Sequence, residues 1–314
     1  MEIMIKLPAI SDAIKESFLH YIEPRFINLL KQFYKASKHS NIKNYFFNGA
    51  NIDKNKIQSV LTGDISCLLD AIKNIGRLDG NSKTTPQQEF IKLYNNFSCS
   101  QLGKSLCDDL GIKVCPYCNR SYIHTLKFHR VRPQYDHFFN KINYPYLAVS
   151  LYNLIPSCSI CNQSKSKEDT YDPTHNTYNF LYPYVDEYGN TVRFKTEYNG
   201  DISYVIGKNE KFNLTIENQS TDTDFQQKVK RTINKLHTKE LYEKHKDYVL
   251  DIIRASQIYS EEYMLDILQK FPNLFNDISD VLRMVYMNYL DKEHWGKRVL
   301  SKLTYDIIKE FQIE

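Results

Sequence analysis

The sequence predicts an α+β fold in which a cysteine-rich core lies between two helical regions. Three observations support this fold class. Apolar residues recur at helical spacing in residues 1–110 and again in residues 219–314. Residues 111–184 lose that spacing and carry two Cys-x-x-Cys pairs among prolines and aromatic residues. Residues 185–218 contain strand-like segments separated by turn motifs, as a β-hairpin does. These four ranges are the domains that the sequence predicts.

The composition is that of a globular protein. Of the 314 residues, 42% are hydrophobic and 25% are charged, which excludes wholesale disorder and collagen-like structure. The formal net charge of +4 permits a nucleic-acid partner but does not by itself indicate one. No uncharged apolar stretch is long enough for a membrane span, and the first residues do not resemble a secretory signal. Because seven cysteines do not suit a disulfide framework, we expect a cytoplasmic protein with reduced thiols.

The N-terminal region is expected to be mostly helical. Ile14, Phe18 and Ile22 fall on one helical face, and Pro24 should break or kink the helix that they begin. Further helices are expected at Ile65–Ile75 and, starting after Pro86, at residues 87–97.

The region after the core is expected to form a hairpin and then helices. Val192–Tyr198 reads as one strand, the following Asn-Gly-Asp as a tight turn, and Ile202–Gly207 as the second strand. Helical spacing returns from Thr221. The helices expected after it cover residues 241–256, 260–271, 274–290 and 293–312.

Two cysteine pairs predict a structural zinc site. Cys115 and Cys118 form one Cys-x-x-Cys pair, and Cys158 and Cys161 form another. Four thiolates from two such turns suit a tetrahedral zinc ion, and the long separation between the pairs indicates an inserted segment. The alternative, a redox pair, needs only one of the two motifs and a thioredoxin-like unit, which the sequence lacks. The remaining thiols, Cys67, Cys99 and Cys107, are expected to be buried and free on helices.

The inserted segment carries polar residues suited to hydrolysis. Asp136 and His137 are adjacent, Asn153 precedes the second cysteine pair, and Asn162 and Lys165 follow that pair directly. The ordered set DHF, YP, NLIPSCSICNQSK resembles the HNH (ββα-metal) nucleases of the zinc-stapled kind. It is especially similar to phage junction-resolving endonucleases and to the HNH subunit of Septu anti-phage systems, including their retron-associated versions. The resemblance covers about 70 residues within the predicted core and implies a zinc-stapled ββα-metal fold there.

The resemblance implies a role for each of these residues. His137 would accept the proton of the attacking water, a role that suits a neutral imidazole. Asp136 and Asn162 would hold one Mg²⁺ or Mn²⁺, since such cations take oxygen ligands. Asn153 would fix the loop that carries His137 by hydrogen bonds from its side chain to the backbone. The family often has histidine where this chain has Asn162, a difference that concerns metal preference.

Each of these residues also has a structural interpretation. Asp136 could form a turn or cap, and His137 could be a buried packing histidine or a zinc-linked histidine. Asn162 could cap the following helix, since asparagine favours that position. Asn153 suits a structural role better than a catalytic one. His175 could join the site but fits a turn better.

Basic residues near the core suggest a surface for phosphates. The candidates for nucleic-acid contacts are Arg130, Arg132, Lys165 and Lys167, with Lys127, His129 and Lys141 nearby. Solubilising charge or a solvated helix face is the alternative. No helix-turn-helix or zinc finger that reads bases is present, so we expect weak sequence preference.

The function expected from the sequence is therefore a metal-dependent endonuclease, with DNA favoured over RNA as the substrate. The resemblance further implies an effector role in phage defence and a possible ABC-type ATPase partner. This chain has no phosphate-binding GxxxxGK[ST] loop of its own. Two alternatives stay open: a non-catalytic zinc-stapled module that binds nucleic acid or protein, and a resolving nuclease of a phage or mobile element.

Overall fold

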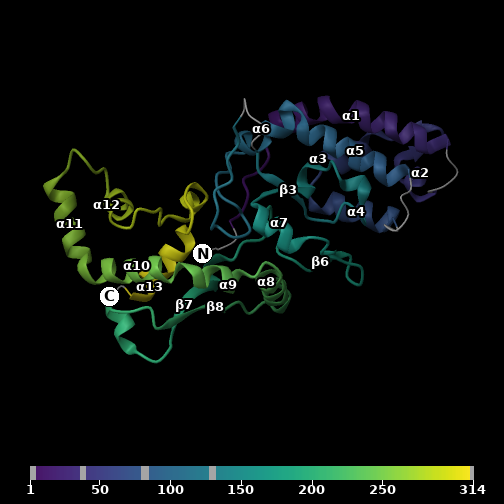
Figure 1. Cartoon of the computed structure of the whole chain (residues 1–314). Coiled ribbons are helices and arrows are strands. Elements are labelled where there is room, and N and C mark those ends of the chain that lie inside the picture. The colour runs from purple at the N-terminus through teal and green to yellow at the C-terminus, as the bar shows by residue number, and fades with distance from the viewer. Residues whose placement is uncertain (1–4, 36–39, 79–84, 127–131, 312–314) are drawn as a thin grey trace. The chain divides into compact units, whose positions relative to one another are not determined.

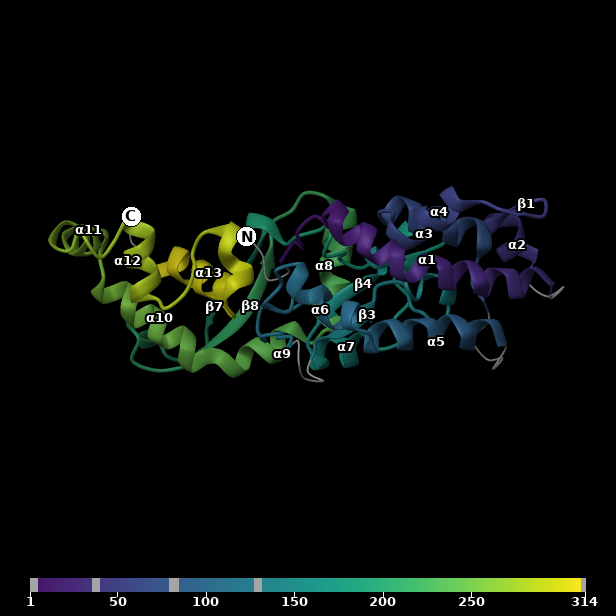
Figure 2. The same cartoon turned by 90° about the horizontal axis from the view of Figure 1, so that it is seen from above.

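The computed structural model describes residues 5–35, 40–78, 85–126 and 132–311 (Figures 1 and 2). The chain divides into two compact units. The first, which we call the N-terminal unit, comprises Pro8–Gly111 and His124–Asn179. The second, the C-terminal unit, comprises Met1–Leu7, Ile112–Ile123 and Phe180–Glu314. Each unit combines segments that are distant in sequence, unlike the four consecutive regions that the sequence predicts.

Helices of the N-terminal unit enclose an aromatic core. Phe26 contacts Phe46 and Phe90 with ring centroids 5.6 and 5.5 Å apart, and Phe18 meets Phe97 at 5.2 Å. All five rings are completely buried, so they exclude water from the space between the helices. The elements are α1 (Asp12–Lys35), α2 (Ser40–Phe46), β1 (Phe47–Asn48), β2 (Asn51–Ile52), α3 (Lys54–Thr62), α4 (Ile65–Ile75), α5 (Thr85–Cys99) and α6 (Gln101–Asp109).

Helix α4 has the bounds that the sequence predicts. The Asp64 carboxylate accepts hydrogen bonds from the backbone N–H groups of Ser66 and Cys67, which fixes the first turn. At the other end, Gly76 has a φ of +80° and donates its N–H to Ile72 O, a backbone conformation that glycine adopts without strain. Both ends are therefore encoded locally.

Of the break or kink expected at Pro24, the break is wrong, because α1 continues through this residue. Pro24 lies on the exposed side of the helix, where a carbonyl that loses its intrahelical partner can bind water instead. Next to it, the Arg25 guanidinium donates to Tyr21 O and lies 4.0 Å from the Tyr21 ring centroid. Burial of Phe18, Ile22 and Phe26 on the opposite side keeps the two halves in one helix.

The N-terminal unit also contains a strand–strand–helix segment. Strand β3 (Gln134–His137) pairs antiparallel with β4 (Leu154–Ser157), and α7 (Ser159–Lys165) follows β4 after one residue. A short ladder of β5 (Tyr171–Asp172) and β6 (Thr177–Tyr178) comes next. The predicted α+β class is confirmed in this coarse form, with helices and small antiparallel sheets.

The C-terminal unit contains the predicted hairpin with a different second strand. Strand β7 (Val192–Tyr198) pairs with β8 (Phe212–Asn218). The expected strand Ile202–Gly207 is wrong, since Ile202–Ile206 forms a 3-10 helix. Asp201 caps that helix through the Ser203 N–H, and Gly207 ends it with a φ of +74°. The backbone N–H groups that form these capping bonds are therefore not available for the different pairing that a tight β-turn requires.

The other edge of β7 is covered by carboxylates from helix α13 (Ser301–Phe311). Asp306 accepts the N–H of Phe194 at 2.9 Å, and Glu310 accepts the N–H of Thr196 at 3.0–3.1 Å. Two acids one turn apart thus satisfy two alternate N–H groups of an edge strand, which blocks pairing with another strand. Lys302 forms a buried ion pair with Asp306.

The predicted helices at residues 274–290 and 293–312 are shorter in the structure. Asp277 caps the first at Asp280 N, and Met287, with a φ of +52°, lies just beyond its end. In the second, Leu300, with a φ of +60°, separates a 3-10 segment from α13 and donates its N–H to Asn119 O. The helices of this unit before α13 are α8 (Thr223–Lys235), α9 (Thr238–Tyr242), α10 (Lys246–Ile258), α11 (Glu261–Lys270) and α12 (Ile278–Val285). Across the described ranges, no helix combines the length and the apolarity that crossing a bilayer requires.

Candidate metal centre and active site

The first cysteine pair lies in a closed turn. Val114 and Tyr122 form an isolated antiparallel bridge, and Cys115 N donates to Ser121 O at 2.9 Å. Within the turn, Asn119 N donates to Cys115 O at 2.8 Å while Asn119 has a φ of +45°. The Cys118 Sγ accepts the N–H of Arg120 at 3.4 Å. The turn therefore presents both sulfurs on one side and polarises one of them with a backbone donor.

The second cysteine pair begins helix α7. Cys158 is its N-cap residue, and its Sγ accepts the N–H of Cys161 at 3.5 Å. The interpretation of Asn162 as the cap of this helix is therefore wrong, because Cys158 occupies that position. Asn162 lies within the first turn, directly after Cys161.

The four cysteines form one buried cluster that can hold a structural metal ion such as zinc. Each residue is at most 9% exposed, and the four sulfurs all lie within 4.8 Å of one another. A tetrahedral zinc ion with Zn–S bonds of about 2.3 Å requires sulfurs about 3.8 Å apart, so a small contraction suffices. The predicted convergence of Cys115, Cys118, Cys158 and Cys161 is confirmed. Of the other thiols only Cys107 is buried; Cys67 is half-buried and Cys99 is exposed, contrary to the prediction.

His137, at the end of β3, is buried, and one nitrogen of its imidazole ring makes a hydrogen bond. Its Nε2 lies 3.0 Å from Ala148 O. A carbonyl only accepts, so Nε2 carries the proton and Nδ1 keeps its lone pair. The ring meets Tyr94 of α5 edge-on, with centroids 4.4 Å apart. Burial, reinforced by the positive charge of Lys141, holds the pKa of His137 well below its usual value, so the ring is neutral.

Asp136 is paired with a lysine that is also buried. Lys165 Nζ lies 3.1 and 3.2 Å from the two carboxylate oxygens, and it donates to His137 O at 2.8 Å and Phe138 O at 3.1 Å. The Lys165 side chain is 0% exposed and that of Asp136 is 4% exposed. The predicted contact of Lys165 with a phosphate therefore does not fit this structure. Helix α7 packs across β3, and that packing turns the ammonium inward.

Asn153 fixes the loop after β3. Its Oδ1 accepts the N–H of Phe139 at 2.7 Å, and its Nδ2 donates to Phe139 O at 3.1 Å and Leu147 O at 3.0 Å. These are the bonds from side chain to backbone that the sequence led us to expect of this residue. Leu147 precedes Ala148, so Asn153 also holds the carbonyl that accepts from His137.

Asn162 lies on α7 and Asp136 on β3, two elements that contact each other. The Asn162 amide donates to Gln134 Oε1 at 2.6 Å, and Lys165, one turn later, contacts Asp136. Successive side chains of a strand point to opposite faces, so Gln134 and Asp136 lie on one face of β3 and His137 lies on the other. Consistent with this, Asp136 contacts α7 while His137 contacts Tyr94 and Ala148. A site that uses all three must lie where β3 ends.

The other residues predicted to contact nucleic acid or the site lie in different environments. Lys167 is exposed just beyond α7. Arg132 is half-buried; its guanidinium donates to Pro133 O and lies 5.8 Å from the Tyr135 ring centroid. Lys127, His129 and Arg130 lie outside the described residues. His175 is exposed in a turn, with Nδ1 2.8 Å from Asp172 Oδ2, as the turn interpretation expects.

Two neighbours of His137 were not predicted to contact it. Tyr94 lies on α5, far away in the chain, and a lone tyrosine on a helix gives no hint of a site. The Lys141 ammonium lies 4.5 Å from the Tyr94 ring centroid, and burial lowers the pKa of this lysine. The sequence analysis named Lys141 only as one of the basic residues near the core.

Comparisons with protein-family models, with curated proteins and with solved structures found no match for this chain. A functional assignment therefore depends on the geometry of the described residues.

Proposed function

We propose that this protein is a metal-dependent endonuclease of the HNH type, which hydrolyses phosphodiester bonds of nucleic acid. The observation that carries the proposal is the arrangement around β3. A neutral imidazole with an oriented tautomer adjoins a carboxylate on the first strand of a strand–strand–helix segment. The helix of that segment starts at the four-cysteine cluster, so a bound zinc ion would fix the position of Asn162.

His137 is the proposed general base. Its Nε2–H is held by Ala148 O, which leaves Nδ1 as the atom that takes a proton from water. A positioned base of this kind contributes about 10²–10⁴-fold to the rate. The carbonyl that orients the ring is itself placed by Asn153 through Leu147, which makes Asn153 a positioning residue in the proposal.

Asp136 and Asn162 would hold a divalent cation such as Mg²⁺ or Mn²⁺. Their oxygen atoms suit hard cations, and the Asn162 amide uses its nitrogen, not its oxygen, for the bond to Gln134. Asp136 accepts from Lys165, but a carboxylate has about four lone-pair sites on two oxygens and can accept more than one partner. When bound, such a cation neutralises charge on the phosphate and assists the leaving oxygen.

A non-catalytic zinc-stapled module is the second candidate, and the Asp136–Lys165 pair favours it. An ammonium within 3.2 Å of both carboxylate oxygens already neutralises the charge that would attract a cation. The preference for DNA over RNA, the role in phage defence or in a mobile element, and an ABC-type ATPase partner come from the resemblance alone.

The deciding experiment measures cleavage of plasmid DNA and of total RNA by the purified protein with Mg²⁺ or Mn²⁺. We expect wild-type protein to cut one of them, and His137→Ala to lose about 10²-fold or more of that rate while keeping its zinc. His20→Ala, which removes an exposed histidine of α1, is the matched control and should cut normally. Equal cleavage by His137→Ala and wild type would refute the assigned role. No cleavage by any form, with zinc bound, would favour the second candidate.

A further inference from the structure

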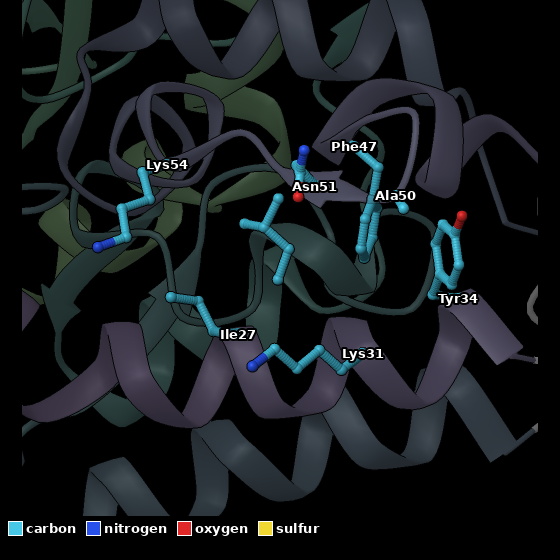
Figure 3. Close-up of a pocket in the computed structure, with 8 residues that line it drawn as sticks. Ile27, Lys31, Tyr34, Phe47, Ala50, Asn51 and Lys54 are labelled. Atoms are coloured by element: carbon cyan, nitrogen blue, oxygen red, sulfur yellow. The ribbon is translucent and has the colours of Figure 1, made fainter.

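The N-terminal unit contains a cavity of about 460 Å³ between helix α1 and the β1–β2 hairpin, as Figure 3 shows. Apolar groups line much of it, chiefly Ile27, Phe47 and Ile52. Lys31 lies beside Ile27 at one edge, and Lys54 lies at the edge opposite Phe47 (Figure 3). No residue of the candidate active site around β3 contributes to this lining.

The charge of the cavity is positive. Neither Lys31 nor Lys54 has a carboxylate within ion-pair distance among the residues that the structure describes, whereas Lys56, close in sequence, pairs with Asp70 at 2.9 Å. The adjacent carboxylate of Asp53 is used to cap α3, where it accepts the N–H of Lys56. Two exposed ammonium groups therefore flank an apolar floor, an arrangement that suits an anion with a hydrophobic body.

An aromatic side chain in the cavity wall adds a second feature that a ligand should match. The Phe47 ring packs against Tyr34 with centroids 4.8 Å apart, and Lys43 lies 4.2 Å from the Tyr34 ring centroid. Figure 3 shows Phe47 between Tyr34 and the hollow, so one ring face is turned toward each. The Tyr34 contact holds Phe47 in place, and its other face can stack with a flat ring. The Asn51 amide at the rim offers both a donor and an acceptor.

We propose that this cavity binds a nucleotide, with the base against Phe47 and Ile52 and the phosphate near Lys31 and Lys54. A flat heteroaromatic ring joined to a phosphate can stack on Phe47, contact the apolar floor and pair with the two ammonium groups at the same time. An aliphatic anion would leave the aromatic face unused, and a neutral aromatic ligand would leave the two ammonium groups unused. The nucleotide can be free or part of a single strand. The proposal does not depend on the nuclease activity.

The test measures binding to the full-length protein, without added divalent metal so that no cleavage intervenes. One arm titrates adenosine monophosphate, and the other a short fluorescent oligothymidylate. Phe47→Leu keeps apolar volume but removes the ring, and we expect affinity to fall by about 5- to 150-fold, the range found for one stacked base. Lys31→Glu should weaken binding and lower the salt dependence by about one phosphate contact.

Lys73→Glu, an exposed lysine of α4 outside the cavity, makes the same change in net charge and is the control. If the test variants weaken binding of oligothymidylate alone, the ligand is a nucleotide within a single strand. If they weaken binding of adenosine monophosphate alone, the ligand is a free nucleotide. Both results support the site. Absence of binding by wild type, or equal affinity of Lys31→Glu and Lys73→Glu, overturns it. If Phe47→Leu fails to fold, the comparison of Lys31→Glu with Lys73→Glu tests the proposed site. Cleavage is measured separately, so loss of one proposal leaves the other standing.

Discussion

Lys165→Met should destabilise the N-terminal unit by about 3–5 kcal/mol, the cost of removing one partner of a buried ion pair. Methionine keeps the long apolar stem but removes the ammonium. Asp136, 4% exposed, then loses the ammonium 3.1 Å from its carboxylate, and His137 O loses its donor at 2.8 Å. Phe138 O is less affected, because Thr170 Oγ1 also donates to it at 2.6 Å. The loss of the ammonium beside a buried carboxylate therefore accounts for most of the expected decrease in stability.

A double-mutant cycle separates the charge from the packing. Adding Asp136→Asn to Lys165→Met removes the buried negative charge, so the double variant should recover a large part of the loss. Lys167→Met, an exposed lysine two residues further on, should change stability by no more than about 0.5 kcal/mol.

Denaturant unfolding followed by circular dichroism provides the measurement. The single tryptophan, Trp295, belongs to the C-terminal unit and gives a separate fluorescence signal. A loss below about 1 kcal/mol for Lys165→Met, or a double variant whose loss equals the sum of the single losses, would contradict the buried-pair argument.

Two further predictions concern the cysteines. Cys118→Ser should lower both the bound zinc per chain and the melting temperature, since structural zinc contributes folding free energy. Metal analysis and thermal melting measure the two effects, with the exposed Cys99→Ser as the control. A Cys118 variant with unchanged zinc content and melting temperature would contradict the prediction. Burial raises the pKa of the Cys107 thiol to about 12, above the usual value near 9. Its neutral form therefore stabilises the fold fully below about pH 9, and this contribution is lost as the pH rises toward 12. Unfolding free energies measured between about pH 9 and 11 should fall more steeply for wild type than for Cys107→Ala, and parallel curves would contradict this.

Local signals in the sequence predicted the parts of the fold that local contacts determine. Helix α4 begins at an aspartate cap and ends at a glycine with positive φ, so its bounds could be read directly. The four cysteines converge because each pair lies in a short turn that the Cys-x-x-Cys spacing encodes. The second strand of the hairpin could not be predicted this way. Both Ile202–Ile206 and Phe212–Asn218 carry apolar residues that suit a strand, and the caps at Asp201 and Gly207 make the first of them a 3-10 helix.

The same distinction applies to the candidate site. The resemblance implies a ββα segment around Asp136 and His137, but the partners of these two residues could not be predicted. A lysine is seldom buried, so the sequence favours solvent or a phosphate as the partner of Lys165, yet the chain has a carboxylate and two carbonyls placed to receive its ammonium. That arrangement depends on how α7 packs across β3. Tyr94 meets His137 only because α5 packs against the end of that strand segment.

The hydrogen bonds of Asn153 and His137 together bear on the choice between a packing histidine and a general base. A histidine that only fills space needs no fixed tautomer, since either ring nitrogen can donate or accept. Here the Asn153 amide binds both Phe139, just after β3, and Leu147 O. The next carbonyl, of Ala148, is thereby aimed at Nε2. Two residues thus determine which nitrogen keeps a lone pair, and a proton acceptor needs that specification whereas a packing residue does not.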